Sequence, residues 1–328
     1  MDPEQHNKTG DVEHLSSLIR ICGLNVCGLT SKINNGILNE YIKQFDIFSV
    51  FETKLAKGTE IENFTVFDLD RKPSNYRLPG IHGLSVYVSD KLAGLCTQIS
   101  EPEFECDNVL WIKVNNYFIL GSVYMSVENP NYNKEQYTEL SLDIFSIKAD
   151  YNLPIVLIGD FNGRTGVLND VLLMETNDNL DIENYDHPDI LNTFNSLNIP
   201  IHRTNMDTKK SNNNGNQIIE MCKLTEICIL NGRFGTDKNI GIFTFDNKST
   251  IDYAMCSPNL FANITDFSID TFDRLLSDKH SPINLTINVD ITNVDKQMPN
   301  NTNVNIDSPI VNKVKWIDSK SEDYKKSV

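Results

Sequence analysis

The chain of 328 residues lacks any run that approaches 18 consecutive apolar residues, the length that a transmembrane helix needs. Its first residues, MDPEQHNKTGDVEH, are acidic and polar, whereas a signal peptide begins with basic residues and continues with an apolar stretch. We therefore expect an intracellular protein of the nucleus or the cytoplasm that has no membrane partner. A strong run of Lys and Arg that would direct nuclear entry is also missing.

Cysteines at the spacing of metal or redox motifs are absent as well. The chain has seven cysteines, which is an odd number, and none of them form a C-x-x-C pair. Free cysteines are among the most buried residue types. We therefore expect free thiols in the core.

Positive charge is scarce. The chain has 29 basic and 45 acidic residues, a net charge of −16, which argues against a broad basic surface that neutralises nucleic-acid phosphates. Residues 291–328 are nearly balanced, with six Lys against five Asp and Glu, so the acidic excess lies upstream. A local basic patch remains open, and we expect tight DNA binding to require a divalent cation.

No Gly-, Pro- or Ser-rich linker of useful length divides the chain, and no internal repeat is visible. We expect one domain over residues 15–290, acting as a monomer. Residues 1–14 are polar without periodicity, and residues 291–328 are rich in Asn, Asp and Pro, a composition typical of disordered termini.

Apolar strand patterns alternate with helical patterns between these ends, which indicates an α/β fold. A dozen strands are too many for one ordinary sheet, so we expect two sheets packed face to face and flanked by helices. A helix with Ile33, Ile37, Tyr41 and Ile42 on one face is expected after the first strand, and further helices are expected near Glu135–Lys148 and Asn216–Leu224. An Asn- and Asp-rich surface insertion over Leu168–Ser211 is expected to contain a short helix near Ile190–Leu197. The expected strands are Leu18–Val26, Asp46–Phe51, Phe64–Leu69, Leu84–Val88, Leu110–Val114, Tyr117–Met125, Ile155–Gly159, Ile227–Leu230, Phe243–Phe245, Ile251–Cys256, Phe267–Thr271 and Ile283–Val289.

Polar residues recur where these strands end. The segment Pro154–Gly166 places Asp160 and Asn162 directly after a buried apolar run, at the strand edge where α/β folds carry their chemistry. Each such residue alone is compatible with an ordinary turn. Their joint occurrence indicates a site. The other members are Asn25, Glu52, Tyr124, Asp252, Asp278 and His280.

This set suits the hydrolysis of a phosphate ester. Glu52 offers a hard carboxylate oxygen of the kind that Mg²⁺ prefers, and such an ion stabilises charge on the phosphate and the leaving oxygen. His280, oriented by Asp252, is suited to proton exchange with a phosphate oxygen or a nucleophile. Asp160 is suited to align or deprotonate the attacking water, and the neutral amides position ligands without adding negative charge.

Six motifs in order resemble the endonuclease/exonuclease/phosphatase (DNase I-like) superfamily over about residues 18–290. Within it the chain is most similar to the endonuclease domain of LINE-type, non-LTR retrotransposon polyproteins. The sequence similarity is greatest in the segments LTEICILNGRFG, FTFDNKSTIDYAM and LLSDKHSPI. The six motifs are N-x-x-G-L from Asn25, a strand ending in Glu52, S-V-Y ending in Tyr124, G-D-F-N over Gly159–Asn162, I-D-Y over Ile251–Tyr253 and a final S-D-x-H-x-P.

The resemblance implies a four-layer α/β sandwich and a DNA endonuclease that depends on Mg²⁺ or Mn²⁺. It implies catalytic roles for Asp160, Asn162, Tyr124, Asp252 and His280. Metal contact is implied for Glu52, with support from Asn25, and Asp278 is placed near the metal or beside His280. Arg164 and Asn231 are candidate substrate contacts. For Arg164 a structural salt bridge is an equally good interpretation.

One departure concerns the last motif. The commoner ending is S-D-H-x-P, whereas Lys279 separates Asp278 from His280 in this chain. Adjacent residues of a strand point to opposite faces, so one inserted residue matters unless a bulge absorbs it. We expect His280 to be functional.

Three functions follow from these observations. The leading hypothesis is a metal-dependent endonuclease of retrotransposon type that nicks DNA and leaves a 3′-hydroxyl end. Only about 38 residues follow the nuclease-like domain, so we expect a truncated, standalone or partial form without a reverse transcriptase. The alternatives are an inactive scaffold with the same fold and a hydrolase of small phosphate esters. The preferred DNA target and the choice between Mg²⁺ and Mn²⁺ stay open.

Overall fold

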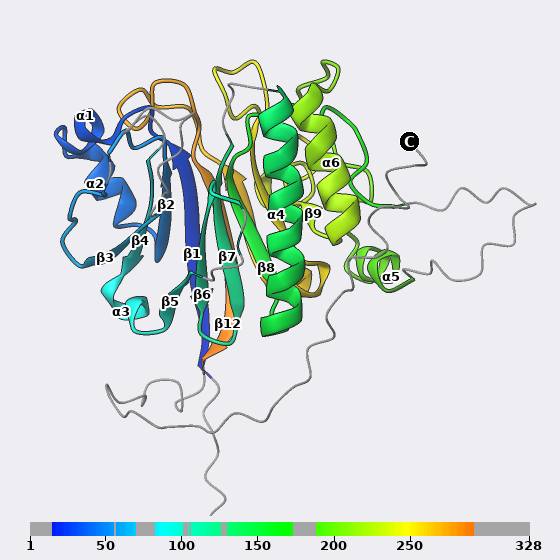
Figure 1. Ribbon diagram of the computed structural model, residues 1–328, viewed down its shortest axis with the longest axis horizontal. Helices are drawn as coiled ribbons and strands as arrows, with labels where there is room; N and C mark the ends of the chain where they lie inside the picture. Colours follow the sequence, from blue (N-terminus) through cyan, green and yellow to red (C-terminus); the bar gives the residue numbers. More distant parts are fainter. Residues whose placement is uncertain are drawn as a thin grey trace, which may run out of the picture.

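The computed structural model describes residues 15–55, 57–69, 83–100, 104, 106–125, 130–172 and 188–291. In this part of the chain two six-stranded sheets pack face to face, with helices on both outer faces (Figure 1). The predicted four-layer α/β sandwich is confirmed. The segments for which we expected disorder lie outside the described residues, except that Ile291 is the last residue of the final strand.

The first sheet has the strand order β11-β12-β1-β2-β4-β3. Its strands are β1 (Leu15–Asn25), β2 (Ile47–Phe51), β3 (Phe64–Asp68), β4 (Leu84–Ser89), β11 (Ile264–Ile269) and β12 (Ile283–Ile291). β1 and β2 are parallel, and the other neighbours pair in antiparallel fashion.

The second sheet has the order β5-β6-β7-β8-β10-β9. Its strands are β5 (Cys96–Ile99), β6 (Val109–Val114), β7 (Phe118–Tyr124), β8 (Ile155–Asp160), β9 (Cys228–Ile229) and β10 (Asp252–Cys256). β7 and β8 form its parallel pair. Each sheet therefore has one parallel pair whose carboxyl ends lie together at one edge.

Helices cover both outer faces of the sandwich (Figure 1). Those against the first sheet are α1 (Leu29–Ile33) and α2 (Ile37–Ile42), and those against the second are α4 (Pro130–Tyr151) and α6 (Asn213–Thr225). The remaining short elements are α3 (Asp90–Ala93), α5 (Pro188–Ser196) and the 3₁₀ helices η1 (Gly235–Asp237) and η2 (Pro258–Asn263).

Side-chain alternation along the strands builds the core. In β1, Ile21 packs between the sheets, whereas Cys22 packs outward with Leu38 of α2. In β8, Ile158 packs between the sheets and Leu157 packs outward against α4. Both strands are apolar on both faces because both faces are covered. The seven cysteines are free, as expected, and six of them are buried.

Two local expectations are wrong. The helical pattern over Ile33, Ile37 and Tyr41 forms two short helices, because Gly36 has a φ of 75° and ends the helical path between them. Phe243–Phe245 is not a strand, since only Phe245 makes isolated bridges. In addition, the pattern analysis missed the edge strand β5.

The expected surface insertion is also corrected in its described part. Arg203, Asn205 and Asp207 are each less than 10% exposed and pack against the loop after β8 and the segment before β10. Their polar composition is typical of a surface loop, yet Asn205 and Asp207 are satisfied by buried hydrogen bonds, and Arg203 Nη2 donates to Thr165 Oγ1 at 3.1 Å.

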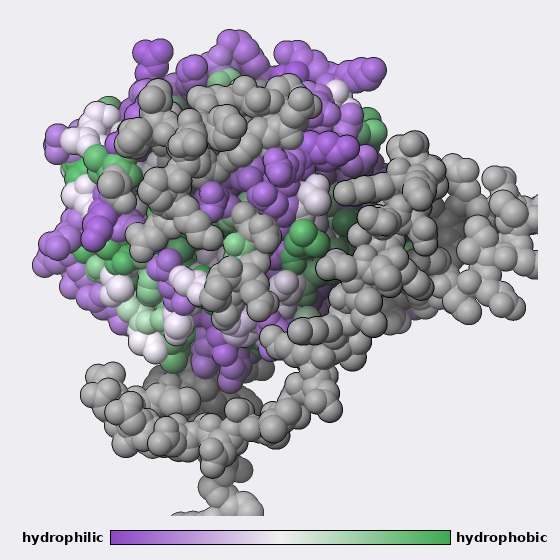
Figure 2. All heavy atoms as spheres, in the orientation of Figure 1, coloured by the Kyte–Doolittle hydropathy of each residue, from purple (hydrophilic) through white to green (hydrophobic). Residues whose placement is uncertain are grey.

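The described surface in the view of Figure 2 is mostly hydrophilic, with smaller apolar areas among the polar residues. Exposed apolar side chains on α4 include Leu142 and Phe145. Within the described ranges, no helix combines the length and the apolar character required to cross a membrane.

Candidate active site

The polar residues that end the central strands point into the space between the sheets. The alternation of β1 and of β8 places Asn25 and Asp160 at the last inward position of each strand. β10 is antiparallel to β8, so its first residue, Asp252, lies opposite Asp160 in the register. Tyr124 ends β7 and is also paired in register with Asp160. All four residues are at most 5% exposed.

Asn25 connects the two sheets. Its Nδ2 donates to Asp160 Oδ2 at 2.8 Å and to Glu52 Oε2 at 3.1 Å. Its Oδ1 accepts from Cys27 N at 2.9 Å, so the amide nitrogen faces the carboxylates. The neutral amide thereby holds two acidic side chains close together without adding charge.

Glu52 reaches this position through an uncommon backbone conformation. It follows β2 and has a φ of 55°, which is costly for a residue with a Cβ and is concentrated at functional sites. Its side chain is 22% exposed, and Oε1 lies 3.3 Å from Lys54 Nζ. Glu52 therefore presents a partly solvent-accessible carboxylate beside the buried one of Asp160.

His280 lies between two carboxylates. Its Nδ1 is 2.9 Å and 3.0 Å from the two oxygens of Asp252, and its Nε2 is 3.8 Å from Asp160 Oδ2. A proton on Nδ1 is donated to Asp252, which fixes the orientation of the ring. The imidazole also packs against Phe245 in a T-shaped arrangement, with ring centroids 4.9 Å apart.

Burial and charge shift the pKa values of this group. Burial and the Asp252 carboxylate raise the pKa of Asp160 to about 7. Burial lowers the pKa of His280, but the charges of Asp252 and Asp160 outweigh this effect and raise it to about 9. At neutral pH the two carboxylates therefore favour the protonated imidazole, and burial favours protonation of Asp160 more than water would. Such values suit proton transfer.

We call Asn25, Glu52, Asp160, Asp252 and His280 the strand-end cluster. The structure brings these five predicted residues together from both sheets and from the loop before β12. Asp160, Asp252 and His280 offer ligand atoms within 4.8 Å of one another. The strong hydrogen bond between His280 and Asp252 indicates an oriented acid–base pair at those two residues, so Glu52 and Asp160 are the better oxygen donors for a cation.

A turn around Ser277 absorbs the additional residue Lys279. Ser277 Oγ donates to Asn25 O at 2.6 Å and accepts from Lys279 N at 3.3 Å and His280 N at 3.1 Å. Asp278 points away: it is 62% exposed and binds Lys32 Nζ at 2.8 Å. The carboxylate of Asp278 therefore lies against Lys32, and not in the expected position beside His280 or a metal. Ser277 stands in the motif that we singled out, but sequence reasoning gave it no role.

Asn162 and Asn231 use their side chains to hold the backbone around the strand-end cluster. Asn162 Nδ2 donates to Met125 O at 2.6 Å, and its N donates to Asp160 Oδ1 at 2.9 Å. Asn231 is 1% exposed, and its amide binds Asp252 O at 3.2 Å and Ala254 N at 3.1 Å. This geometry makes Asn231 a support for β10, in contrast to the expected substrate contact.

Arg164 lies on the loop after β8, four residues after Asp160. Its Nε donates to Asp207 Oδ2 at 2.6 Å, and its side chain is 27% exposed. The salt bridge that we considered as an alternative is therefore present. Asp207 was not a candidate, because no motif marks it within the Asn- and Asp-rich segment.

Comparisons with known proteins identify the fold. No protein-family model matches the chain, and no curated protein sequence matches it significantly. The structure is similar to the AP endonuclease LMAP from Leishmania major, with a TM-score of 0.56 and 14% identity over 82% of this chain and 87% of that chain. It is also similar to the endonuclease domain of TRAS1, a telomere-specific non-LTR retrotransposon, with a TM-score of 0.53 and 16% identity over 83% of this chain and 98% of that domain. The chain has the DNase I-like fold.

Proposed function

We propose that this chain is an endonuclease that nicks DNA and depends on Mg²⁺ or Mn²⁺, as in the retrotransposon type. The observation that carries the proposal is the strand-end cluster, in which Asn25 joins Glu52 to Asp160 and His280 is paired with Asp252. The two similar structures support it, because both are endonucleases by name. Because all residues of the cluster come from one chain, we also propose that the protein acts as a monomer. We further propose that the protein acts inside the cell, in the nucleus or the cytoplasm.

The cluster contains the donors that such a cation needs. Glu52 and Asp160 provide hard carboxylate oxygens, which Mg²⁺ and Mn²⁺ prefer, and Asn25 holds both from its Nδ2. A bound divalent cation would offset the charge that develops on the phosphate and on the leaving oxygen. The oxygen donors do not favour one of the two ions.

The protein's own groups account for the proton transfer from the attacking water and for the stabilisation of the phosphate. Asp160 is placed to align the water that attacks phosphorus in line and to accept a proton from it. The bond from phosphorus to the 3′ oxygen breaks, and that oxygen takes up a proton from solvent water to leave a 3′-hydroxyl end. Protonated His280 stabilises a phosphate oxygen, with Asp252 fixing its ring. Tyr124 and Asn162 complete the proposed set, with Tyr124 near the phosphate and Asn162 holding the loop.

The test is the conversion of supercoiled plasmid to open circle by purified protein with Mg²⁺ or Mn²⁺. We expect nicking that is lost with EDTA and lost in Glu52→Gln. Glu40→Gln is the matched control, since Glu40 is an exposed residue of α2. Absence of nicking with both cations, in a folded sample, would contradict the proposal and favour an inactive scaffold. Release of phosphate from soluble esters with intact DNA would favour a phosphatase.

A further inference from the structure

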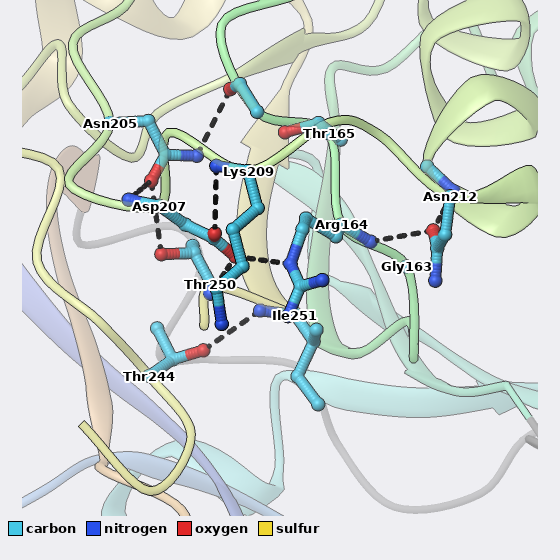
Figure 3. Close-up of polar contacts among 12 residues, drawn as sticks. Gly163, Arg164, Thr165, Asn205, Asp207, Lys209, Asn212, Thr244, Thr250 and Ile251 are labelled. Atoms are coloured by element: carbon cyan, nitrogen blue, oxygen red, sulfur yellow. Dashed lines mark hydrogen bonds and ion pairs between the residues drawn. The ribbon is translucent and has the colours of Figure 1, made fainter. Parts of the chain in front are cut away.

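Arg164 is held by a buried carboxylate at the edge of the proposed active site. Asp207 is 1% exposed, and its Oδ2 accepts from Arg164 Nε at 2.6 Å and from Thr250 N at 3.2 Å, whereas Oδ1 accepts from Lys209 N at 3.4 Å (Figure 3). Thr250 lies two residues before Asp252 in the chain. Asp207 therefore fixes the guanidinium of Arg164 to the segment that leads into β10.

The backbone of Arg164 is equally constrained. Asn212, the N-cap of α6, accepts from Arg164 N at 2.9 Å through Oδ1, and its own N donates to Arg164 O at 3.1 Å (Figure 3). Gly215 packs so closely that a Cβ there would lie 1.8 Å from Arg164 O. On the other side of the loop, Tyr253 OH donates to Gly163 O at 2.9 Å. The start of α6 and the start of β10 thus clamp the loop between them.

This arrangement leaves the outer part of the guanidinium available. Arg233, by comparison, is fully buried and gives both terminal nitrogens to Asp170, at 2.6 Å and 2.7 Å. Arg164 gives Asp207 only its Nε, and its side chain is 27% exposed. Among the described residues, its two terminal nitrogens have no hydrogen-bonding partner. A guanidinium held in this way presents a planar pair of donors that matches two oxygens of a phosphate.

The position of Arg164 distinguishes it from the strand-end cluster. Within the described part of the chain, no hydrogen bond or ion pair joins it to Asp160, Asp252 or His280. It follows Asp160 by four residues, which limits the distance between their backbones to about 14 Å. Arg164 is therefore close in the chain to the strand-end cluster but lies outside its hydrogen-bond network.

We propose that Arg164 binds a second phosphate, adjacent to the one that is cleaved, and that Asp207 is the positioning residue that holds Arg164 for this contact. This inference rests on the proposed endonuclease function and specifies its substrate class. The substrate is a polynucleotide with at least two consecutive phosphates, in preference to an isolated phosphate ester. A fixed cation is valuable here because the chain has a net charge of −16 and must bind a polyanion.

The experiment compares two substrates in the presence of Mg²⁺ or Mn²⁺: an oligonucleotide duplex and bis(4-nitrophenyl) phosphate, which has a single phosphodiester. For Arg164→Gln we expect KM for the duplex to rise about 10-fold, with kcat/KM for the small diester within about twofold of wild type. We also expect the slope of log binding constant against log salt, measured by fluorescence anisotropy, to fall by about one. Relative to Arg164→Gln, the variant Arg164→Lys restores the positive charge but not the bidentate pair of donors. It should therefore restore the salt slope more fully than it restores KM for the duplex.

Controls separate binding from folding. Arg164→Gln leaves the Asp207 carboxylate buried without its partner, so the double variant Arg164→Gln/Asp207→Asn removes both charges and preserves shape. Lys43→Gln is the matched control, because Lys43 is an exposed residue near the start of β2, at the opposite edge of the sheet from Glu52. It should behave as wild type with both substrates.

The possible outcomes discriminate between the two proposals. An equal loss of activity on both substrates would show that Arg164 has only a structural role and would overturn the phosphate contact. An unchanged KM for the duplex in both Arg164 variants would overturn it as well. If the wild type binds the duplex in an Arg164-dependent way but does not nick it, the contact stands and the endonuclease proposal fails. A wild type that neither binds nor nicks DNA overturns both.

Discussion

His280 Nδ1 lies 2.9 Å from one carboxylate oxygen of Asp252 and 3.0 Å from the other, although 28 residues separate them in the chain. Both side chains are almost fully buried. An imidazole held by a carboxylate on one nitrogen keeps the other nitrogen directed at a fixed point. In this protein that point is beside Asp160, whose Oδ2 is 3.8 Å from Nε2.

Replacing Asp252 by Asn should therefore impair turnover more than binding. The variant keeps the shape of the side chain but loses the charge that orients His280 and favours its protonated form. We therefore expect kcat for nicking to fall by about 10² to 10⁴ with KM nearly unchanged. Steady-state nicking rates with a circular dichroism check measure this. Asp266→Asn is the control, because Asp266 is an exposed residue of β11. A rise in KM with an unchanged kcat would argue that Asp252 only shapes the surface that binds the substrate.

Glu52 should determine the response to the divalent cation. Ligand binding to the folded state raises the apparent stability in proportion to the logarithm of cation concentration. Titration of Mn²⁺ in a thermal unfolding assay should therefore raise Tm for wild type and for Glu40→Gln, and the rise should be absent or much smaller in Glu52→Gln. An equal rise in all three proteins would place the cation elsewhere.

The backbone of Lys279, and not its side chain, should matter for the active site. Its Nζ lies 5.6 Å from the centre of the Phe245 ring, whereas its N donates to Ser277 Oγ. Lys279→Ala should retain nicking within about threefold, since an exposed cation–π contact is worth only about 0.5–1 kcal/mol. Deletion of Lys279 should abolish nicking, because the turn that delivers His280 loses a residue. Activity in the deletion variant would show that the loop adapts freely.

Asp170 should link stability to acid pH. It is fully buried against Arg233, and although burial raises its pKa, the guanidinium groups of Arg233 and Arg203 together lower it below its usual range. A carboxyl whose pKa is lower in the folded state stabilises the protein above its unfolded-state pKa of about 3.9, and this stabilisation is lost as the pH falls further.

The measurement is chemical denaturation of wild type and Asp170→Asn between about pH 7 and pH 3. At neutral pH the variant should be less stable by about 3–5 kcal/mol, because it leaves the arginines without their counter-charge. The difference should shrink as the pH falls below about 4. A difference that is constant with pH would contradict the assigned lowering of the Asp170 pKa.

Much of the fold follows from the sequence. Apolar segments predicted eleven of the twelve strands in the described residues, and the polar residues near the ends of these strands pointed to the strand-end cluster. Turn chemistry was harder to interpret. Gly36 divides one predicted helix because its positive φ is visible only in three dimensions, and β5 was missed because two of its four side chains are not buried.

The remaining features depend on partners that are distant in the chain. Asn25 and Asp160 are 135 residues apart, and Arg164 and Asp207 are separated by 43 residues. The same holds for Asp278, which the motif places beside His280 but which Lys32 draws away. No local pattern encodes these pairs.

The sequence by itself determined where most of the described strands lie and which polar residues stand near their ends, because a buried strand needs an apolar run and the turn that follows it favours polar residues. Only the tertiary structure decided which of these side chains meet and how Asp207 holds Arg164. These relations arise when two sheets pack and exclude water, since burial and the charges of neighbouring groups then change hydrogen bonding and pKa values together.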